Sequence, residues 1–267
     1  MEVKCAYSVV SRGTERRRTR LHGGFDGRFG YINIAHSADQ YWIRPLAHGV
    51  AGSIDGALCC TSSALATVAI ARIQLVAASA LHSSLSVLCR HEPALVIGTG
   101  AIALGAVLEL KRLGCPNVVI HAPLLKAEMP TLGIEGVSVI QSLAQDLKFG
   151  LVIDAVSTSE SIALALAHSK TKGVIGLLGS PDGFASIDLY KVHRNNLNLI
   201  GLHELNESDE QRQVLLEEVH RWLESKYASF AESVCRIHPA KDFSSIYPAL
   251  LAQTQPFLIH CFDWSEA

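Results

Sequence analysis

A short glycine-containing segment between a strand and a helix constrains the fold of this chain most. Ala94-Leu95-Val96-Ile97 is a continuous apolar run, typical of a strand covered on both faces of a sheet. Gly98-Thr99-Gly100-Ala101-Ile102-Ala103 follows directly, and a helical pattern then runs from Ile102 to Leu113. Glycines at the first and third positions let the backbone turn tightly, and a small sixth residue lets the helix pack on the strand. The free N–H groups at the start of such a helix are suited to binding an anion.

The G-x-G-x-x-A spacing in this context predicts a dinucleotide site formed by Gly98, Thr99, Gly100, Ala101, Ile102 and Ala103. The alternative is a strand-to-helix turn that binds no ligand. The next strand, 117–120, is followed by His121, Ala122 and Pro123, so the acid that binds the ribose 2′-OH of NAD is missing. His121, Lys126 or an arginine of the run 12–20 is a candidate to neutralise a 2′-phosphate, which favours NADP, with NAD still possible. Lys126 fits a surface lysine equally well.

Apolar runs and helical periods alternate along the following part of the chain. Strands are expected at 137–140, 151–154, 173–178 and 197–200, with a helix at 159–168. This pattern predicts an α/β protein whose residues 91–231 form a doubly wound parallel sheet of the Rossmann type. Ligands bind at the carboxyl ends of such strands, which adds Asp154, Ser157, Gly179 and Ser180 as cofactor-binding candidates. An amphipathic helix at 208–226 is expected to cover this sheet.

The segments 1–90 and 232–267 are less periodic and hold short strand candidates such as 257–261. They are expected to form one accessory domain from both chain ends. The stretch 57–88 carries a single charge, Arg72, but its many Ser and Thr residues interrupt the apolar run that a membrane span needs. It is interpreted as a buried helix.

Composition narrows the class of partner. The 267 residues are 49% hydrophobic and 18% charged, and the net charge is −2. Such a chain is expected to fold around a sizeable core, and no global field draws it to nucleic acid or an anionic membrane. The seven cysteines show no C-x-x-C spacing, and no secretory signal is visible, so a reducing cytoplasmic location and a small-molecule partner are expected.

Three blocks resemble the medium-chain dehydrogenase/reductase family. They are Ser11-Arg12-Gly13-Thr14-Glu15, the loop 98–103, and Leu151-Val152-Ile153-Asp154-Ala155 with the following segment 173–179. The resemblance spans most of the chain. It implies a GroES-like catalytic domain, formed by both termini, around a Rossmann domain, with substrate and nicotinamide between the two.

The chain departs from the zinc-dependent branch of that family. Arg12 stands where that branch has a metal-binding cysteine, and a guanidinium cannot replace a thiolate ligand. The branch's Gly-His-Glu motif and four-cysteine lobe have no counterpart, so no metal is expected. The Ser-x-Gly-Thr-Glu block is similar to zinc-free relatives. The chain is also shorter than ordinary members, which implies a reduced GroES-like β domain.

Without a metal, hydride transfer requires hydrogen-bond donors or a cation near the oxygen where charge develops. The resemblance places Thr14 first, because its hydroxyl matches a proton-relay position; a helix cap is the alternative. Arg12, Tyr31 and His48 are the other catalytic candidates; the alternative for Arg12 is a solvated surface position, like the rest of its basic run. Glu15 matches a structural acidic position.

The expected function is therefore a zinc-independent, NAD(P)-dependent oxidoreductase acting on a small alcohol, ketone or conjugated alkene. One alternative is a catalytically idle binding or structural subunit with the same fold. A methyltransferase, whose glycine loop also follows a first strand, is another. The strand at 197–200 is an expected sheet edge, and an exposed apolar edge needs covering, so a homodimer is expected.

Overall fold

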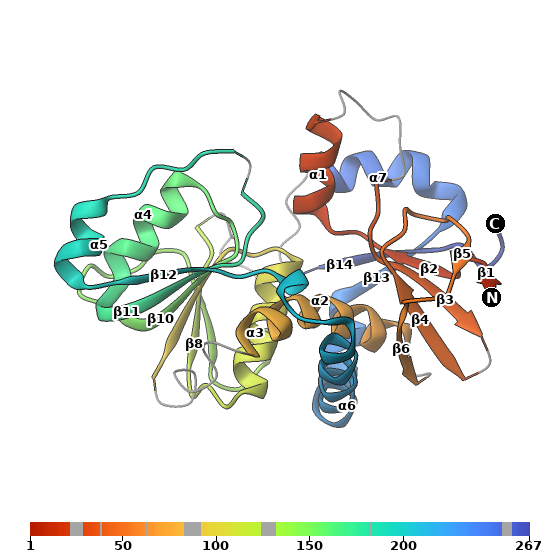
Figure 1. Cartoon of the computed structure of the whole chain (residues 1–267), viewed down its shortest axis with the longest axis horizontal. Coiled ribbons are helices and arrows are strands. Elements are labelled where there is room, and N and C mark those ends of the chain that lie inside the picture. Colours follow the sequence, from red (N-terminus) through yellow and green to blue (C-terminus); the bar gives the residue numbers. More distant parts are fainter. Residues whose placement is uncertain are drawn as a thin grey trace. The chain divides into compact units, whose positions relative to one another are not determined.

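The computed structural model describes residues 1–21, 29–37, 39–61, 64–82, 92–123, 132–181, 183–252 and 258–267. The chain forms two compact units. The first combines Met1–Leu75 with Glu207–Ala267, and the second is Val76–Asn206. Both chain ends thus belong to one unit (Figure 1). Helix α2 (Leu65–His82) contributes residues to both units.

The second unit is built on a parallel sheet of six strands in the spatial order β12-β11-β10-β7-β8-β9. Chain order runs outward in both directions from the neighbours β7 and β10, which makes this pair the topological switch point of a doubly wound sheet. The predicted parallel sheet is therefore confirmed. The strands are β7 (Ala94–Ile97), β8 (Val118–His121), β9 (Val137–Ile140), β10 (Phe149–Asp154), β11 (Ser169–Leu177) and β12 (Asn198–Gly201).

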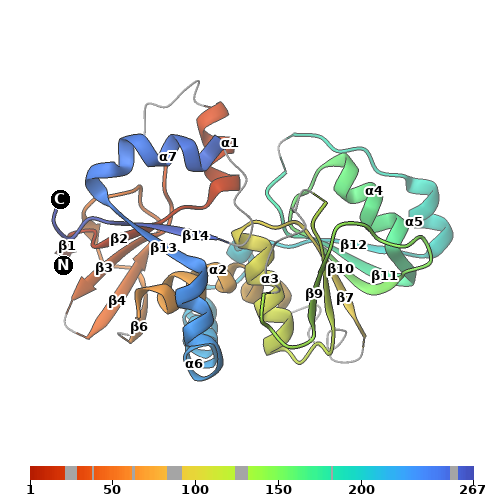
Figure 2. The same ribbon diagram turned by 180° about the vertical axis from the view of Figure 1, so that it is seen from behind.

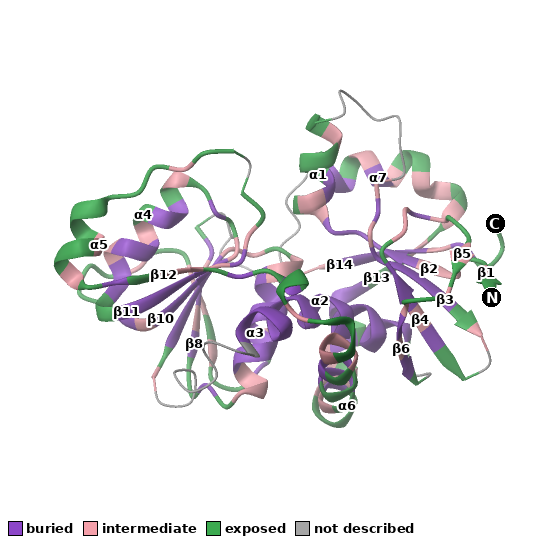
Figure 3. Ribbon diagram, viewed as in Figure 1, coloured by how far each residue is buried: buried purple, intermediate pink, exposed green. Residues whose placement is uncertain are grey.

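Helices cover both faces of this sheet. Helix α3 (Ala101–Arg112) packs on β7 and β8, whereas α4 (Ser159–His168) packs on β10 and β11 and α5 (Leu189–Asn195) on β11. Figures 1 and 2 show α3 on one face and α4 and α5 on the other. Because both faces are covered, the central strands are buried along their length, as Figure 3 shows in purple. This burial explains why the strands read as continuous apolar runs.

The first unit is built on a second six-stranded sheet, in the order β13-β14-β2-β3-β4-β6. Only the β13–β14 pair is parallel, and the C-terminal β14 pairs with the N-terminal β2. The predicted domain made from both chain ends thus has a physical basis in this pairing. The strands are β2 (Tyr7–Val9), β3 (Asn33–Ser37), β4 (Gln40–Arg44), β6 (Leu58–Thr61), β13 (Cys235–Pro239) and β14 (Ile259–Asp263), beside a separate pair of β1 (Glu2–Val3) and β5 (Gly52–Ser53).

Two helices of the first unit contact each other, α1 (Arg12–Leu21) and α7 (Phe243–Ala252). Helix α7 supplies Tyr247, Leu250 and Leu251 to a core cluster that also contains Phe262 and Trp264 of the C-terminal segment. Short 3-10 turns lie at Glu204–Asn206 and Ala240–Asp242. The core cluster therefore fastens the C-terminal part of the chain to residues near its start, including Cys5 and Val10.

Helix α6 (Asp209–Val234) lies elsewhere than predicted. It begins after Ser208, whose side chain accepts a hydrogen bond from the N–H of Gln211, but it belongs to the first unit and packs on β6. The Gln213 amide donates to the carbonyl of Cys59 (2.7 Å) and accepts from its N–H (2.8 Å). The helix thus satisfies backbone groups of an edge strand. Amphipathicity predicts that a helix covers an apolar surface, not which surface.

The stretch 57–88 also differs from expectation. It opens with strand β6 and only then forms helix α2. The described part of α2 is buried along nearly its whole length, which explains its apolar composition. No helix among the described residues is long and apolar enough to cross a membrane.

Candidate active site

The loop after β7 has the geometry that the glycine pattern predicts. Gly98 has φ 120°, a conformation that side chains rarely adopt, and its N–H donates to the carbonyl of His121 at 3.3 Å. A Cβ on Gly98 would lie 3.0 Å from Cγ2 of Val156 and 3.6 Å from Cβ of Ala155. Glycine is therefore required here both for the turn and for the close approach of the loop that follows β10.

The start of α3 is open. Gly100 is its N-cap, in an extended conformation and without a side-chain cap, and a Cβ built on it meets no described atom within 4 Å. The first helical bond runs from the N–H of Leu104 to the carbonyl of Gly100, at 3.0 Å. The N–H groups of Ala101, Ile102 and Ala103 precede that bond, so they are the orphan donors of the helix. Ala103 is buried, which lets α3 pack closely on the sheet.

Asp154, at the end of β10, shapes the neighbouring loop. Its carboxylate is fully buried, and Oδ1 accepts from the N–H groups of Val156 (2.9 Å) and Ser157 (3.0 Å). Oδ2 accepts from the hydroxyl of Ser161 at 2.8 Å. The sequence placed Asp154 among the cofactor contacts; its buried oxygens instead hold the loop that carries Ser157. We therefore regard Asp154 as a positioning residue.

Ser157 provides an observation that fits a bound group. Its φ is 59°, in the left-handed region, and its side chain is only 6% exposed. Among the described residues, its buried Oγ has no hydrogen-bond partner. A buried hydroxyl without a partner costs free energy, so strain and an orphaned polar atom at the switch point are what a ligand-binding position would show.

Gly179 and Ser180 follow β11. A Cβ on Gly179 would lie 2.6 to 2.8 Å from the backbone of Ala155 and Val156, so this glycine permits two loops to touch. The N–H groups of Leu178 and Gly179 both donate to the carbonyl of Asp154, at 2.9 and 3.0 Å. Ser180 is exposed. The predicted cofactor residues 98–103, 154, 157 and 179 thus lie on adjoining loops at one end of the sheet.

His121 ends β8, where an acidic residue was expected and not found. It is half-buried, and burial lowers its pKa, while a hydrogen bond from the imidazole to the backbone carbonyl of Gln141 opposes this and His168 adds a further decrease. A lowered pKa favours the neutral imidazole, so His121 is a hydrogen-bonding residue rather than a cation in the unliganded protein. Lys126, the other candidate for a 2′-phosphate, lies outside the described residues.

The first unit contains a buried polar cluster centred on Glu15. One carboxylate oxygen accepts from the N–H of Ser11 at 2.7 Å, and the other accepts from the hydroxyl of Tyr247 at 2.6 Å and from Nε2 of His48 at 3.1 Å. Glu15, His48 and Tyr247 are all fully buried. Burial, and then the Glu15 carboxylate, raise the pKa of Tyr247, so its hydroxyl remains a donor. Glu15 thus fastens the start of α1 to α7.

His48 does not have the open position expected of a residue that contacts a substrate. Its Nδ1 lies 2.7 Å from the hydroxyl of Ser8, which itself accepts from Nε1 of Trp264 at 2.8 Å. Because the Glu15 carboxylate can only accept, Nε2 of His48 carries a proton that it donates to Glu15. Both ring nitrogens are engaged and the side chain has no exposed area. His48 is therefore a positioning residue, which corrects its assignment as a catalytic group.

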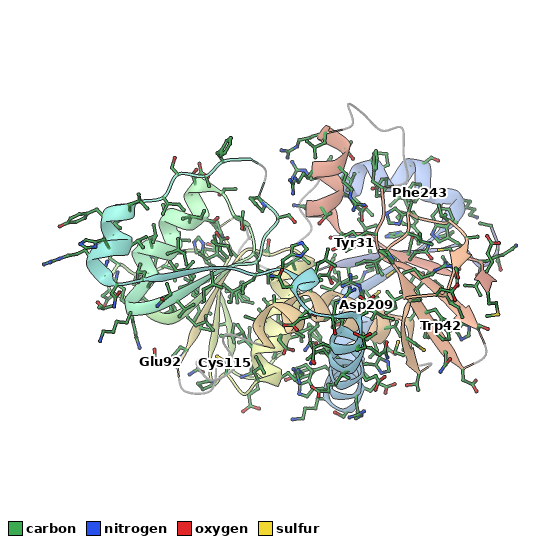
Figure 4. The ribbon with its side chains drawn as sticks, viewed as in Figure 1. Tyr31, Trp42, Glu92, Cys115, Asp209 and Phe243 are labelled. Carbon is green, nitrogen blue, oxygen red and sulfur yellow. The ribbon has the colours of Figure 1, made fainter. Side chains whose placement is uncertain are left out.

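The remaining catalytic candidates gather around Ser11. Tyr31 donates its hydroxyl to Oγ of Ser11 at 3.0 Å, and Arg12 and Thr14 follow Ser11 in the first turn of α1. All three candidates are partly exposed, in contrast to His48. Figure 4 labels Tyr31 next to α1. Burial and the neighbouring Arg16 lower the pKa of Arg12, which marks a crowded positive charge.

Sequence reasoning missed Ser8, Tyr247 and Trp264 as members of this cluster. They come from β2, α7 and the segment after β14, and no local motif links them to Glu15. The only available signal was a Glu in the Ser-x-Gly-Thr-Glu block, which was assigned a structural role. Among the described residues, no three His, Cys, Asp or Glu side chains are grouped so as to hold a metal ion.

Comparison with known proteins rests on structure, because no family model and no curated protein matches the sequence. The chain is similar to galactitol-1-phosphate dehydrogenase from Escherichia coli (TM-score 0.72, 14% identity, 98% of this chain and 92% of that one). It is also similar to S. aureus TarJ in complex with NADPH (0.71, 14%, 98% and 90%). Acetophenone reductase from Geotrichum candidum in complex with NAD gives 0.68 at 16% identity, over 100% and 91%.

At sequence identities this low, structural similarity is informative about the fold alone. The neighbours cover nearly all of this chain, so both units are matched. The expectation drawn from the three sequence blocks is therefore confirmed at that level: the chain has the fold of the medium-chain dehydrogenase/reductase family, a Rossmann unit and a GroES-like unit formed by both chain ends.

Proposed function

We propose that the protein is a zinc-independent, NAD(P)-dependent oxidoreductase that acts on a small molecule. The observation that carries this proposal is the start of α3 at the switch point, where a Cβ on Gly100 meets no atom of the described residues and three orphan N–H groups precede the first helical bond. A pyrophosphate is the group that such a helix start is suited to bind. Two of the similar structures contain NADPH and NAD, which supports the same reading.

The residues of the second unit fit a dinucleotide. Gly98, Thr99 and Gly100 with the N–H groups of Ala101, Ile102 and Ala103 would hold the pyrophosphate, and the unpartnered hydroxyl of Ser157 would bond to the ribose or nicotinamide. When bound, the cofactor supplies or accepts the hydride. We further propose NADP as the preferred form, because β8 ends in His121 and not in an acid.

The first unit would stabilise charge on the reacting oxygen. Arg12 and Thr14 are partly exposed donors, as reduction of a carbonyl or of a conjugated alkene requires, while Tyr31, partly exposed beside them, donates its one hydroxyl proton to Ser11. In the reverse direction, the Thr14 hydroxyl would relay the proton of an alcohol toward solvent, and Arg12, which stays protonated, would stabilise the developing alkoxide. Glu15 and His48 would hold the backbone of this segment in position from the interior.

Zinc independence is part of the proposal, since Arg12 occupies the position of a metal-binding cysteine in the family's zinc branch. Metal analysis of the purified, active protein tests it. We expect substoichiometric zinc and no loss of activity after dialysis against a strong chelator. Stoichiometric zinc that is required for turnover would refute this part while leaving nucleotide binding intact.

The central experiment is titration of NADPH and NADH into the protein and into two matched glycine variants. Gly100→Val places a side chain where the pyrophosphate should lie, and Gly201→Val makes the same change at the end of β12, where a Cβ also meets no described atom. We expect Gly100→Val to keep the parent melting temperature, and we compare it with Gly201→Val on nucleotide affinity alone, because Gly201 lies on the strand proposed below to join two copies. Gly201→Val should bind NADPH normally, whereas Gly100→Val should lose at least about tenfold in affinity, equivalent to ~1.4 kcal/mol.

The outcomes separate the alternatives. Nucleotide binding by Gly100→Val as tight as that of the parent would refute the assigned site. A parent that binds neither NADPH nor NADH would favour the idle-subunit alternative, and binding of S-adenosylmethionine in their place would favour a methyltransferase. Hydride transfer from NADPH to a panel of ketones and enones then tests the reaction.

We also propose a homodimer joined along β12. This strand is an edge of the parallel sheet, and its Leu199 and Ile200 are half-buried. An edge strand presents unpaired backbone groups that a second copy can pair. Light scattering should give twice the chain mass of 28.8 kDa. A monomeric mass at micromolar concentration would refute it.

A further inference from the structure

Helix α1 carries an unusual concentration of positive charge. Its sequence, RGTERRRTRL, holds five arginines and a single acid, Glu15. Glu15 is fully buried, and its carboxylate accepts hydrogen bonds from Ser11, Tyr247 and His48. Its charge is thus committed to the interior of the unit, and the other side of the helix is strongly cationic.

The spacing of the arginines aligns three of them. Arg12, Arg16 and Arg20 are four residues apart, so they lie along one side of the helix, and we call them the arginine stripe. Arg17 is about 100° further round the helix than Arg16. Like charges at this spacing repel each other. Burial, and then the neighbouring Arg16, lowers the pKa of Arg12.

Two further guanidiniums lie near the ring of Tyr31, one from the exposed Arg18 and one from the buried Arg72. The guanidinium of Arg18 lies 5.8 Å from the ring centroid of Tyr31, and that of Arg72 lies 5.7 Å from it. Tyr31 donates its hydroxyl to Ser11, directly before Arg12. The partly exposed donors Arg12, Thr14 and Tyr31 therefore sit in a field that would stabilise an anion and disfavour a cation.

The geometry points to a substrate that bears an oxyanion, a phosphate or a carboxylate group, bound by Arg12 and Arg16 of the arginine stripe. This inference rests on the proposed function, whose substrate contacts are Arg12, Thr14 and Tyr31. Paired guanidiniums match the planar or tetrahedral oxygens of such groups through several charge-assisted hydrogen bonds. The anion would also relieve the repulsion between neighbouring arginines.

Two other oxyanion sources fit the observations less well. The 2′-phosphate of NADP is expected near the end of β8, where His121 is the candidate partner. A protein that binds the phosphates of a nucleic acid is typically basic over a broad surface, whereas this chain has a net charge of −2. A small-molecule oxyanion needs only the local cluster.

The test uses three ligands with one carbon skeleton and the full-length protein. Calorimetric titration at constant ionic strength compares sn-glycerol 3-phosphate, D-glycerate and glycerol, with inorganic phosphate as a further probe. We expect at least one of the two anions to bind and glycerol not to bind. Whichever of phosphate or carboxylate binds more tightly identifies the group.

Matched variants locate the site. Arg16→Gln and Arg17→Gln remove the same charge from neighbouring exposed positions of the same helix. We expect Arg16→Gln to weaken anion binding about tenfold, the size of one charge-assisted hydrogen bond, and Arg17→Gln to weaken it less than about twofold. The double variant Arg12→Gln/Arg16→Gln should abolish it. Circular dichroism checks that α1 is retained.

Three results would overturn the inference. Equal losses in Arg16→Gln and Arg17→Gln would show a diffuse charge effect, and binding of neither anion above glycerol would show no site. Loss of NADPH affinity but not of NADH affinity in the double variant would assign the arginines to the 2′-phosphate. Failure of the proposed function is separate, because it would appear as absent nucleotide binding in the parent, whatever the anion titrations give.

Discussion

The two units build their polar centres in opposite ways. In the second unit, the candidate cofactor site uses three short continuous segments, 98–103, 154–161 and 178–180, each at the end of a strand. In the first unit, the cluster around Glu15 draws Ser8, His48, Tyr247 and Trp264 from both ends of the chain. The first kind of centre depends on local backbone geometry, and the second depends on burial. Mutations in the two centres should therefore have different effects on stability and on nucleotide binding.

The largest effect is expected from Gly179→Val. The new Cβ would lie 2.6 to 2.8 Å from the backbone of Ala155 and Val156, which has no flexible end that can move aside. We expect a loss of about 3 kcal/mol or more in the free energy of unfolding, measured by urea denaturation. Gly100→Val, where the Cβ is unobstructed, is the control. Equal stabilities would show that backbone approach does not define this site.

Glu15→Ala tests the first unit. It leaves the hydroxyl of Tyr247, Nε2 of His48 and the N–H of Ser11 buried without their acceptor. We expect a loss of about 3 kcal/mol in unfolding free energy, and Tyr247→Phe, which removes one donor, should cost about 1 kcal/mol. Nucleotide affinity of the folded fraction should stay at the parent value. A Glu15→Ala protein as stable as Tyr247→Phe would contradict the central role of the carboxylate.

The next largest effect is a decrease in the free energy of unfolding at low pH, caused by a histidine of the first unit. Burial, with His238 and Arg236 nearby, lowers the pKa of His260 to about 4, and Nε2 of His238 lies 2.9 Å from Nδ1 of His260. Because the unfolded state then binds more protons than the folded state between about pH 6.5 and 4, stability should fall through that window as pH decreases. The expected loss is about 2 kcal/mol.

Urea midpoints at pH 7 and 4.5 measure this effect. His260→Gln should flatten the decrease relative to the parent, because it removes a group whose pKa is lower in the folded state than in the unfolded state. His193→Gln, an exposed histidine of the second unit, is the matched control and should keep the parent's pH dependence. If the urea midpoint of His260→Gln decreased between pH 7 and 4.5 as much as that of the parent, the assignment of the pH effect to His260 would be contradicted.

The smallest effect is expected from Ser157→Ala. Its hydroxyl has no hydrogen-bond partner among the described residues, so its removal should leave the melting temperature unchanged or slightly higher. If the hydroxyl binds the cofactor, NADPH affinity should decrease about fivefold, measured by fluorescence titration. A lower melting temperature with unchanged affinity would indicate a structural role.

Several elements were predictable because local rules govern them. Strand β7 and helix α4 have the predicted bounds, and the other strands of the parallel sheet lie within a few residues of expectation. Strands that are buried on both faces consist of continuous apolar runs, which are visible in the sequence. Helix α4 starts at a capping box formed by Thr158 and Ser161. The glycine loop was also predictable from a local rule, because glycine is the residue type that readily adopts φ 120°, the value at Gly98.

Other features were not predictable because they depend on which distant segments meet. The sequence by itself determined the parallel sheet, its glycine turn and a separate unit made from both chain ends, since period, turn chemistry and strand burial act over a few residues. Only the tertiary structure decided that α6 covers β6, that Asp154 faces inward, and that His48 lies buried between Ser8 and Glu15. Amphipathicity and polarity are properties of single segments, whereas the surface that a segment packs against depends on how all segments of the chain pack together.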